Sequence, residues 1–363
     1  MRIALLGTRG IPASYGGFET FAEEISVRLV ERGHFVTVYC RERHPQSSYR
    51  GVRLRYLPPV RHKYFETVAH TAVSTLDVLF RRFDVVLYCN AANAILTIWP
   101  RLRGTPTALN VDGLERYRKK WNRIAKAWYL LSEWIATWSS SAIVTDAARI
   151  REYYRERYGK ESSFIPYGAE TGKVNETEAL QALGLLPGRY VLYVSRMEPE
   201  NNALMVRQAF EKVQTDVKLA LVGDAPYAVS YIEQVKNTRD PRIVIPGAIY
   251  GSAYHQLQSH SAVYVQATEV GGTHPALIEA MGRGALVLYL DTPESAEVAA
   301  GAAVPFTGED DLIEKLRWAV NVSEEERAEW GRRAMARVEK FYSWNVVSDA
   351  YEDLFRRLTS RHE

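Results

Sequence analysis

The segment from residue 270 to residue 282 carries residue types that suit an anion-binding site. It places Gly271, Gly272 and Thr273 between a short apolar run and a stretch with helical periodicity. The first N–H groups of a helix lack partners within the helix and carry the positive end of its dipole, so small residues there let phosphate oxygens approach. Glu279 follows further along this helix, where a carboxylate can accept hydrogen bonds from two ribose hydroxyls. The segment therefore predicts a pocket for a sugar nucleotide.

Arg196 follows another strand-like run, residues 190–195. Its guanidinium can pair with a diphosphate through two parallel hydrogen bonds, and we expect it to stabilise the charge that develops there. The alternative is a surface arginine that balances Glu198 and Glu200. Asn202 either contacts the same ligand or only caps the helix that follows it.

The segment 247–250 also follows a strand-like run. We expect Gly247 and Ile249 to offer main-chain groups to the base of the nucleotide, and Tyr250 to pack against the face of that base. An ordinary turn between a strand and a helix explains the glycine equally well on spacing alone.

In the first half of the chain, Gly16 and Gly17 precede a predicted helix. They allow the main chain to lie close to the donor phosphates or to the transferred sugar. Glu19 either reaches the ligand or only complements the helix dipole. Asp112 follows the strand-like run 107–110, and we expect it to orient the acceptor hydroxyl or the donor sugar, with a helix cap as the alternative.

Other cofactor chemistry is not indicated. The GxGxxG spacing is absent and no acidic residue ends the run 35–40, which disfavours a nicotinamide oxidoreductase. No Asp-x-Asp stands near these motifs, so we expect no cofactor and no obligatory metal, the nucleotide sugar being a substrate. Cys40 and Cys89 each end an apolar run and predict buried thiols.

Strand-like and helical runs alternate in two series, and this alternation implies parallel sheets. The expected strands of the first series are 2–6, 35–40, 52–57, 84–89, 107–110 and 142–145. Those of the second series are 190–195, 217–222, 242–245, 262–266 and 285–289. Each candidate residue above follows one of these runs or opens the next helix, as ligand-binding residues of doubly wound sheets do.

A length of 363 residues predicts two domains. Glycines and prolines punctuate the chain at 168–188, and a kink at 341–344 can turn the last helix, 345–358, back across the first domain. We predict an α/β fold of two facing doubly wound Rossmann-like domains with the ligand in the cleft between them. The acceptor-side domain is 1–168 with a returning C-terminal helix at 345–363, and the donor-side domain is 169–344.

The net charge of +3 conceals an imbalance: the chain through Glu170 holds 26 Lys and Arg against 16 Asp and Glu. A basic first half suits an anionic surface, and since no nucleic-acid motif accompanies it, contact with an anionic membrane is the expectation to test.

The basic run 116–120 leads into an apolar stripe at helical spacing, for which a core position is the favoured interpretation. The stripe consists of Trp121, Ile124, Trp128, Leu131, Ile135 and Trp138. The start of the chain does not resemble a signal peptide, which predicts a cytoplasmic protein, with the inner face of the cell membrane as a second location.

Together these features resemble the B-type fold of the retaining family 4 nucleotide-sugar glycosyltransferases, over essentially the whole chain. That family carries Gly-Arg-x-x-x-x-Lys after a strand and Glu-x7-Glu in its second domain. Arg196 matches the arginine and Glu279 the second glutamate, whereas Asn201 stands at the lysine and Gly271 at the first glutamate. The family often has histidine in the region of Asp112.

Four segments further resemble the rhamnosyltransferase-like enzymes of bacterial polysaccharide assembly: 7–20, 110–115, 199–202 and 270–273. This resemblance implies transfer, with retention, of a sugar, rhamnose being favoured, from a deoxythymidine or uridine diphosphate to a saccharide acceptor. The acceptor would be free or carried on polyprenyl diphosphate. We expect the acceptor to contact Tyr15, Glu19, Glu115 and Arg116. A sugar-nucleotide 2-epimerase of the same fold and a catalytically silent assembly partner remain as alternatives.

Overall fold

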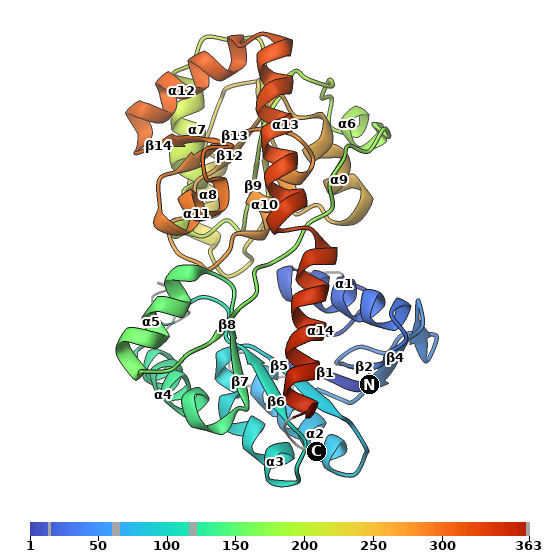
Figure 1. Ribbon diagram of the computed structural model, residues 1–363. Helices are drawn as coiled ribbons and strands as arrows, with labels where there is room; N and C mark the ends of the chain where they lie inside the picture. The colour runs from blue at the N-terminus through green and yellow to red at the C-terminus, as the bar shows by residue number, and fades with distance from the viewer. Residues whose placement is uncertain (14–15, 60–65, 115, 117–121, 361–363) are drawn as a thin grey trace. The chain divides into compact units, whose positions relative to one another are not determined.

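The computed structural model describes residues 1–13, 16–59, 66–114, 116 and 122–360. The chain divides into two compact units (Figure 1). Unit 1 comprises Met1–Tyr167 and Trp344–Glu363, and unit 2 comprises Gly168–Ser343. Each unit is an α/β structure built on its own sheet.

Unit 1 contains an eight-stranded sheet with the order β3-β4-β2-β1-β5-β6-β7-β8. Its strands are β1 (Arg2–Leu6), β2 (Phe35–Cys40), β3 (Ser48–Tyr49), β4 (Val52–Tyr56), β5 (Val85–Cys89), β6 (Thr107–Asn110), β7 (Ala142–Thr145) and β8 (Ser163–Phe164). The edge strand β3 pairs antiparallel with β4, and the other neighbouring strands within the described residues run parallel. Without the two edge strands, the order along the chain is 3-2-1-4-5-6, that of doubly wound nucleotide-binding sheets.

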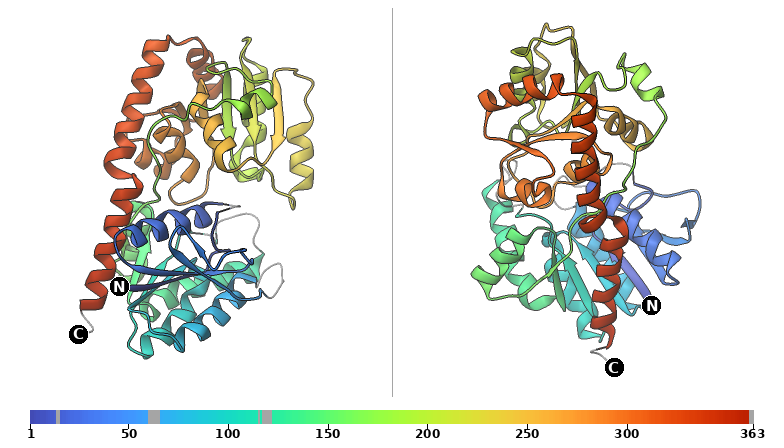
Figure 2. Two further views of the ribbon diagram at one scale, coloured as in Figure 1. Left: turned by 90° about the vertical axis from the view of Figure 1, so that its right-hand side faces the viewer. Right: turned by 45° about the horizontal axis from the view of Figure 1, so that its top comes forward.

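The last helix of the chain belongs to unit 1. The helices of this unit are α1 (Gly17–Glu31), α2 (Glu66–Leu79), α3 (Ile98–Leu102), α4 (Arg123–Ser139), α5 (Ala148–Tyr158) and α14 (Trp344–Ser360), with a 3-10 helix η1 (Ala91–Thr97). Helix α14 packs against α1 and runs beside the sheet (Figure 2). Tyr351 of α14 is fully buried with its ring centroid 5.3 Å from that of Phe21. The expected return of the C-terminal helix to the first domain is therefore confirmed.

Unit 2 contains a six-stranded parallel sheet with the order β11-β10-β9-β12-β13-β14, which again reads 3-2-1-4-5-6 along the chain. Its strands are β9 (Tyr190–Val194), β10 (Lys218–Val222), β11 (Ile243–Gly247), β12 (Val263–Gln266), β13 (Leu286–Leu290) and β14 (Val304–Phe306). Its helices are α6 (Glu178–Ala182), η3 (Pro199–Asn201), α7 (Ala203–Glu211), α8 (Val229–Lys236), α9 (Gly251–His260), α10 (Pro275–Gly282), α11 (Pro293–Ala299), α12 (Glu309–Asn321) and α13 (Glu324–Phe341).

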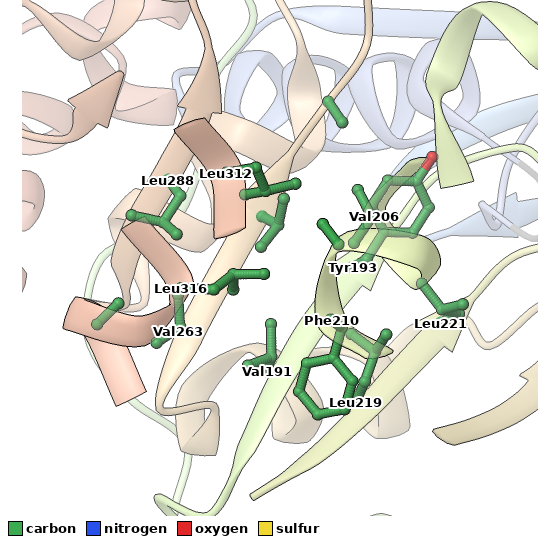
Figure 3. Packing of buried hydrophobic residues seen from close by; sticks show 14 of the residues in the cluster. Val191, Tyr193, Val206, Phe210, Leu219, Leu221, Val263, Leu288, Leu312 and Leu316 are labelled. Carbon is green, nitrogen blue, oxygen red and sulfur yellow. The ribbon is translucent and has the colours of Figure 1, made fainter. Parts of the chain in front are cut away.

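The core of unit 2 explains why its strands are apolar along their whole length. Figure 3 shows Val191 and Tyr193 of β9 packed with Phe210 of α7 and with Leu312 and Leu316 of α12. Helices cover a parallel sheet on both faces, so alternation of polar and apolar residues is lost. Each fully buried side chain of this size contributes about 1.5–3 kcal/mol relative to exposure, so the core fixes the positions of the strand ends.

The predicted fold class of two Rossmann-like α/β domains is confirmed. Every expected strand is present, with ends shifted by at most two residues. The short strands β3, β8 and β14 were not predicted, because runs of two or three residues have no usable periodicity. Among the described residues, no helix combines the length and the apolar character that crossing a bilayer demands.

One prediction for unit 1 is wrong. The apolar stripe of α4 was expected in the core, but Ile124, Trp128, Leu131 and Trp138 are all exposed. Ile135 alone of the described stripe residues joins the core. Trp121 lies outside the described residues.

Candidate functional site

The strand order of unit 2 places its two main motifs beside each other. Strands β9 and β12 are direct neighbours, paired Val265 to Tyr193, although three α-helices, one 3-10 helix and two strands separate them in the sequence. The chain leaves β9 toward Arg196 and leaves β12 toward Gly271. The strand order reverses at this point, and the crevice outside the carboxyl ends of such strands is where doubly wound sheets bind ligands.

The side chain of Arg196 is partly exposed beside a buried carboxylate. Its guanidinium lies 3.7 Å from Oε2 of Glu198, and 43% of its side chain is exposed, whereas Glu198 is buried. The hydroxyl of Tyr227 also donates a hydrogen bond to Glu198. An acidic neighbour therefore exists, as the surface-arginine interpretation required, but this long contact leaves much of the guanidinium accessible.

The two asparagines after Arg196 order their own loop. The Asn201 side chain donates to the carbonyl of Arg196 at 2.7 Å, and Tyr193 donates to the carbonyl of Asn201 at 2.6 Å. Asn202 has a left-handed backbone, with φ of 61°, and its amide donates to the carbonyl of Ala267 at 3.0 Å. Asn202 occupies the N-cap position of α7, as the cap interpretation required, but its side chain makes no capping bond and instead connects the β9 loop to the end of β12.

The segment after β12 leads into α10 as the sequence predicted. His274 occupies the N-cap position with Pro275 at the first helical position, and Thr273 is buried. A Cβ atom on Gly271 would lie 2.7 Å from Cε1 of His274, so a larger residue there would require the His274 ring to move. Gly272, between them, is buried as well. The contact with His274 was not foreseen.

Glu279 is half-buried on α10, and a residue of α9 holds it. The hydroxyl of Tyr254 donates to Oε2 of Glu279 at 2.6 Å, and the amide of Gln258 donates to the Tyr254 hydroxyl at 2.7 Å. Tyr254 was not predicted, because its separation of 25 residues from Glu279 carries no signal in the sequence.

The loop 247–250 connects β11 to this same helix α9. Gly247 ends β11 with φ of 89°, a conformation that favours glycine, and its carbonyl accepts from the N–H of Gly223 at 2.9 Å. Ile249 is half-buried, and Tyr250 is 51% exposed at the N-cap of α9. The loop therefore lies one helical turn before Tyr254.

In unit 1, Gly16 is the N-cap residue of α1, and Gly17 is its first residue. Glu19 lies in the first turn and is buried, and its Oε1 accepts from the N–H of Arg9 at 3.1 Å. Burial raises the pKa of Glu19, while this main-chain bond opposes the shift. Glu19 thus binds the loop that follows β1, in addition to its place at the start of the helix.

Asp112 has a strained backbone directly after β6. Its φ is 59°, and its N–H donates to Oδ1 of Asn110 at 3.0 Å. The Asn110 amide in turn donates to the hydroxyl of Tyr351 at 2.8 Å. Such left-handed residues cost on the order of 1–3 kcal/mol and cluster at functional sites. Gly113 and Leu114 are not helical, so Asp112 does not directly precede a helix.

The Arg116 side chain takes part in a hydrogen-bonded network around the buried carboxylate of Glu133. Its Nε donates to Glu133 at 3.0 Å and its terminal nitrogen to the hydroxyl of Tyr153 at 2.7 Å. Tyr153 and Tyr158 both donate to Glu133 as well, at 2.7 and 3.2 Å. Tyr15 and Glu115, the other expected acceptor contacts, lie outside the described residues.

Cys40 and Cys89 are free and buried, as predicted. Within the part of the chain that the structure describes, no group of three or more His, Cys, Asp or Glu side chains is placed to hold a metal ion.

The whole fold is similar to that of known enzymes. A sucrose-phosphate synthase from Thermosynechococcus elongatus is 18% identical and superimposes over 99% of each chain with a TM-score of 0.80. HepE of Anabaena, in complex with UDP and glucose, is 13% identical over 99% of this chain and 100% of that one, also with a TM-score of 0.80. WaaG, a glycosyltransferase involved in lipopolysaccharide biosynthesis, is 15% identical over 99% of this chain and 100% of its own, with a TM-score of 0.74.

Family models agree with the fold. Residues 15–173 match Glycosyltransferase Family 4, and residues 188–321 match Glycosyl transferases group 1, so the two models together span most of the chain. Each of the two units thus matches a glycosyltransferase family, and the fold is that of the B-type glycosyltransferases. The chain is also 24% identical over 237 residues to the lipopolysaccharide 1,2-N-acetylglucosaminetransferase of Salmonella typhimurium. That match covers 59% of this chain and 62% of the relative's length.

Proposed function

We propose that this glycosyltransferase moves a sugar from a nucleoside diphosphate to a saccharide acceptor during the synthesis of a cell-surface polysaccharide. One observation carries the proposal: Arg196 and the segment from Gly271 to Thr273 leave neighbouring strands at the reversal point of the unit 2 sheet. Glu279 follows on the helix that this segment opens. The similarity to HepE with bound UDP and glucose and to a lipopolysaccharide transferase supports this assignment.

The proposed chemistry depends on charge. As the sugar leaves, it acquires oxocarbenium character and the diphosphate gains negative charge. Arg196 and the N–H groups of residues 271–273 would stabilise that charge, each donor contributing about 2.7–4 kcal/mol by analogy with oxyanion holes. Asn201 supplies no cation where the family has lysine, and its amide is already bonded within its loop. The main-chain groups therefore carry more of the phosphate binding.

We further propose that the donor sugar is rhamnose, on deoxythymidine or uridine diphosphate, and that the configuration of the anomeric carbon is retained. The acceptor would be carried on a polyprenyl diphosphate at the inner face of the cell membrane. Asp112 would orient the acceptor hydroxyl or the donor sugar, and no metal would be obligatory. Complete loss of activity in a chelator would contradict this last point.

A thermal-shift screen of nucleoside diphosphates and their sugars tests the donor, because a ligand that binds only the folded protein raises its melting temperature. Stabilisation by one nucleotide and its sugar conjugate is expected. The anomeric configuration of the product, read by NMR, then tests retention. If no nucleoside diphosphate stabilises the protein, the proposal is wrong.

Incubation of the donor without acceptor separates a transferase from an epimerase. A transferase only hydrolyses the donor slowly, whereas a 2-epimerase changes its sugar. Nucleotide binding without turnover on any acceptor would instead indicate a catalytically silent assembly partner.

A further inference from the structure

Helix α4 buries a mixture of polar and apolar residues, the latter being Tyr129, Ile135 and Ala136, while its outer side carries large apolar residues. Its buried side includes Ser132, Glu133 and Ser139, which are at most 3% exposed. The buried Glu133 is stabilised by hydrogen bonds from Arg116, Tyr153 and Tyr158. A surface helix normally turns its large apolar residues to the core, so those on the outer side of α4 need an explanation outside unit 1.

The outward side of α4 is continuous and apolar. Five large residues on it are 37–81% exposed: Ile124, Trp128, Leu131, Trp134 and Trp138. Their spacing of three or four residues places them along one stripe of the helix. The rings of the last two are in edge contact, 5.7 Å between centroids. We call this stripe the outer face of α4.

Basic residues border the outer face. The guanidinium of Arg101, on α3, donates to the carbonyl of Trp138 at the end of α4. Trp99 and Leu102 of the same short helix are 53% and 72% exposed, which extends the apolar surface onto α3. Arg101 and Arg103 are both exposed at this end of the apolar surface. The acidic residue of α4 itself, Glu133, is buried, so the charges of this helix that reach solvent are those of the exposed Arg123 and the half-buried Lys126.

We propose that the outer face of α4 binds the surface of an anionic phospholipid bilayer. Tryptophans with leucine and isoleucine on one side, bordered by lysine and arginine, are the residue types that lie at the boundary between headgroups and acyl chains. Each basic residue near an anionic surface adds to the attraction between protein and lipid. The inference extends the proposed function, since a lipid-linked acceptor would bring the enzyme to a membrane.

A second copy of the chain fits the outer face less well. In a twofold dimer the same patch meets itself, so two basic borders would face each other. Like charges brought together in this way oppose association. An anionic bilayer meets the apolar stripe and its basic border with complementary chemistry.

Vesicle flotation of the full chain tests the proposal. We expect the wild-type protein to float with vesicles of phosphatidylcholine and phosphatidylglycerol, and to float poorly with phosphatidylcholine alone. The double variant Ile124→Ser/Trp134→Ser should bind at least roughly tenfold more weakly, the factor that corresponds to 1.4 kcal/mol. Arg123→Gln and Lys126→Gln should each cost roughly fivefold at low salt and less at high salt.

The matched control is Leu186→Ser/Val229→Ser, which removes two apolar side chains of unit 2 that are 67% and 59% exposed. This variant should float as the wild type does. Equal recovery with neutral and anionic vesicles, or unchanged flotation of Ile124→Ser/Trp134→Ser, would overturn the proposal. Sedimentation that finds a dimer abolished by these substitutions, without flotation, would overturn it in favour of self-association.

Failure of this inference is distinguishable from failure of the proposed function. A protein that transfers sugar to a water-soluble acceptor but does not float contradicts the membrane proposal alone. A protein that floats but neither binds nor turns over a nucleotide sugar contradicts the proposed function and supports the membrane proposal. Thermal shifts with nucleotide should be the same for all the variants above.

Discussion

The hydroxyl of Tyr254 lies 2.6 Å from Oε2 of Glu279 and donates a hydrogen bond to it. This contact joins α9 to α10. Gln258, fully buried on α9, donates a hydrogen bond to the Tyr254 hydroxyl. The position of the carboxylate that we assign to ribose is therefore set by a residue of the helix that follows the loop 247–250. A shift of α9 would therefore change both the loop assigned to the base and the carboxylate assigned to the ribose.

Replacement of Tyr254 by Phe should weaken nucleoside diphosphate binding roughly fivefold, since one hydrogen bond contributes about 1 kcal/mol. Titration calorimetry measures this change. Tyr190→Phe is the matched control, because that buried hydroxyl donates to the carbonyl of Leu257 and does not touch Glu279. An equal loss of affinity in both variants would show that general loosening of unit 2, and not the position of Glu279, is responsible.

Replacement of Arg196 by Gln should lower kcat/KM by roughly a hundredfold to a thousandfold, as expected for loss of about 2.7–4 kcal/mol of transition-state stabilisation. The melting temperature should hardly change, because the side chain is 43% exposed. Arg239→Gln, another exposed arginine of unit 2, serves as control in the same steady-state assay. Normal turnover by Arg196→Gln would refute the assigned role.

The variant Asp112→Asn should lose transfer activity by at least roughly a hundredfold, the lower range for a positioned acid or base. Donor binding should persist, because the donor ligands assigned to unit 2 are untouched. Asparagine tolerates the left-handed backbone of this position, so the fold should be preserved. Turnover close to that of the wild type, measured with saturating donor, would remove Asp112 from the mechanism.

Gly223→Ala should destabilise unit 2 by about 3 kcal/mol or more through a steric clash. A Cβ atom there would lie 1.7 Å from the carbonyl oxygen of Ser195, with φ at +147°. Gly308→Ala is the comparison, since its extended backbone accepts any residue and a Cβ would contact nothing within 4 Å. Chemical denaturation should separate the two variants clearly, and similar midpoints would contradict the predicted clash.

Glu352 should make the attachment of α14 dependent on pH. Burial alone would raise its pKa, but hydrogen bonds from Arg356, His34 and Arg32 lower the pKa to about 2. The stabilisation is therefore fully present above the ordinary pKa of 4.5 and is lost as the pH falls toward 2. The melting temperature of Glu352→Gln should lie below that of the wild type at neutral pH, and the gap should close on acidification. A gap that is constant across this pH window would rule out the ionised carboxylate as its cause.

The fold was predictable because buried parallel strands are short apolar runs bounded by glycine and polar residues. Strand ends also located Arg196, Asp112 and the 271–273 segment, since ligand residues of such sheets follow the strands. Tyr254 and Tyr351 were not predictable, because each touches its partner through tertiary packing between distant segments.

The error on α4 has a physical origin. Periodicity reports that a helix has an apolar stripe, but it does not report which side of the helix faces the protein. Here the neighbouring side is buried instead, because Arg116 and two tyrosines compensate the charge and hydrogen-bonding needs of Glu133. A carboxylate among apolar residues at 129–136 was the available signal for such a network.

The discontinuity of unit 1 has a consequence for biosynthesis. Its N-terminal portion ends at Tyr167, and the helix that buries Tyr351 against Phe21 begins only at Trp344. During translation unit 2 can therefore fold as one continuous segment. The N-terminal part of unit 1 cannot complete its core until α14 has left the ribosome. A premature stop after α13 would harm the part of the molecule that was synthesised first.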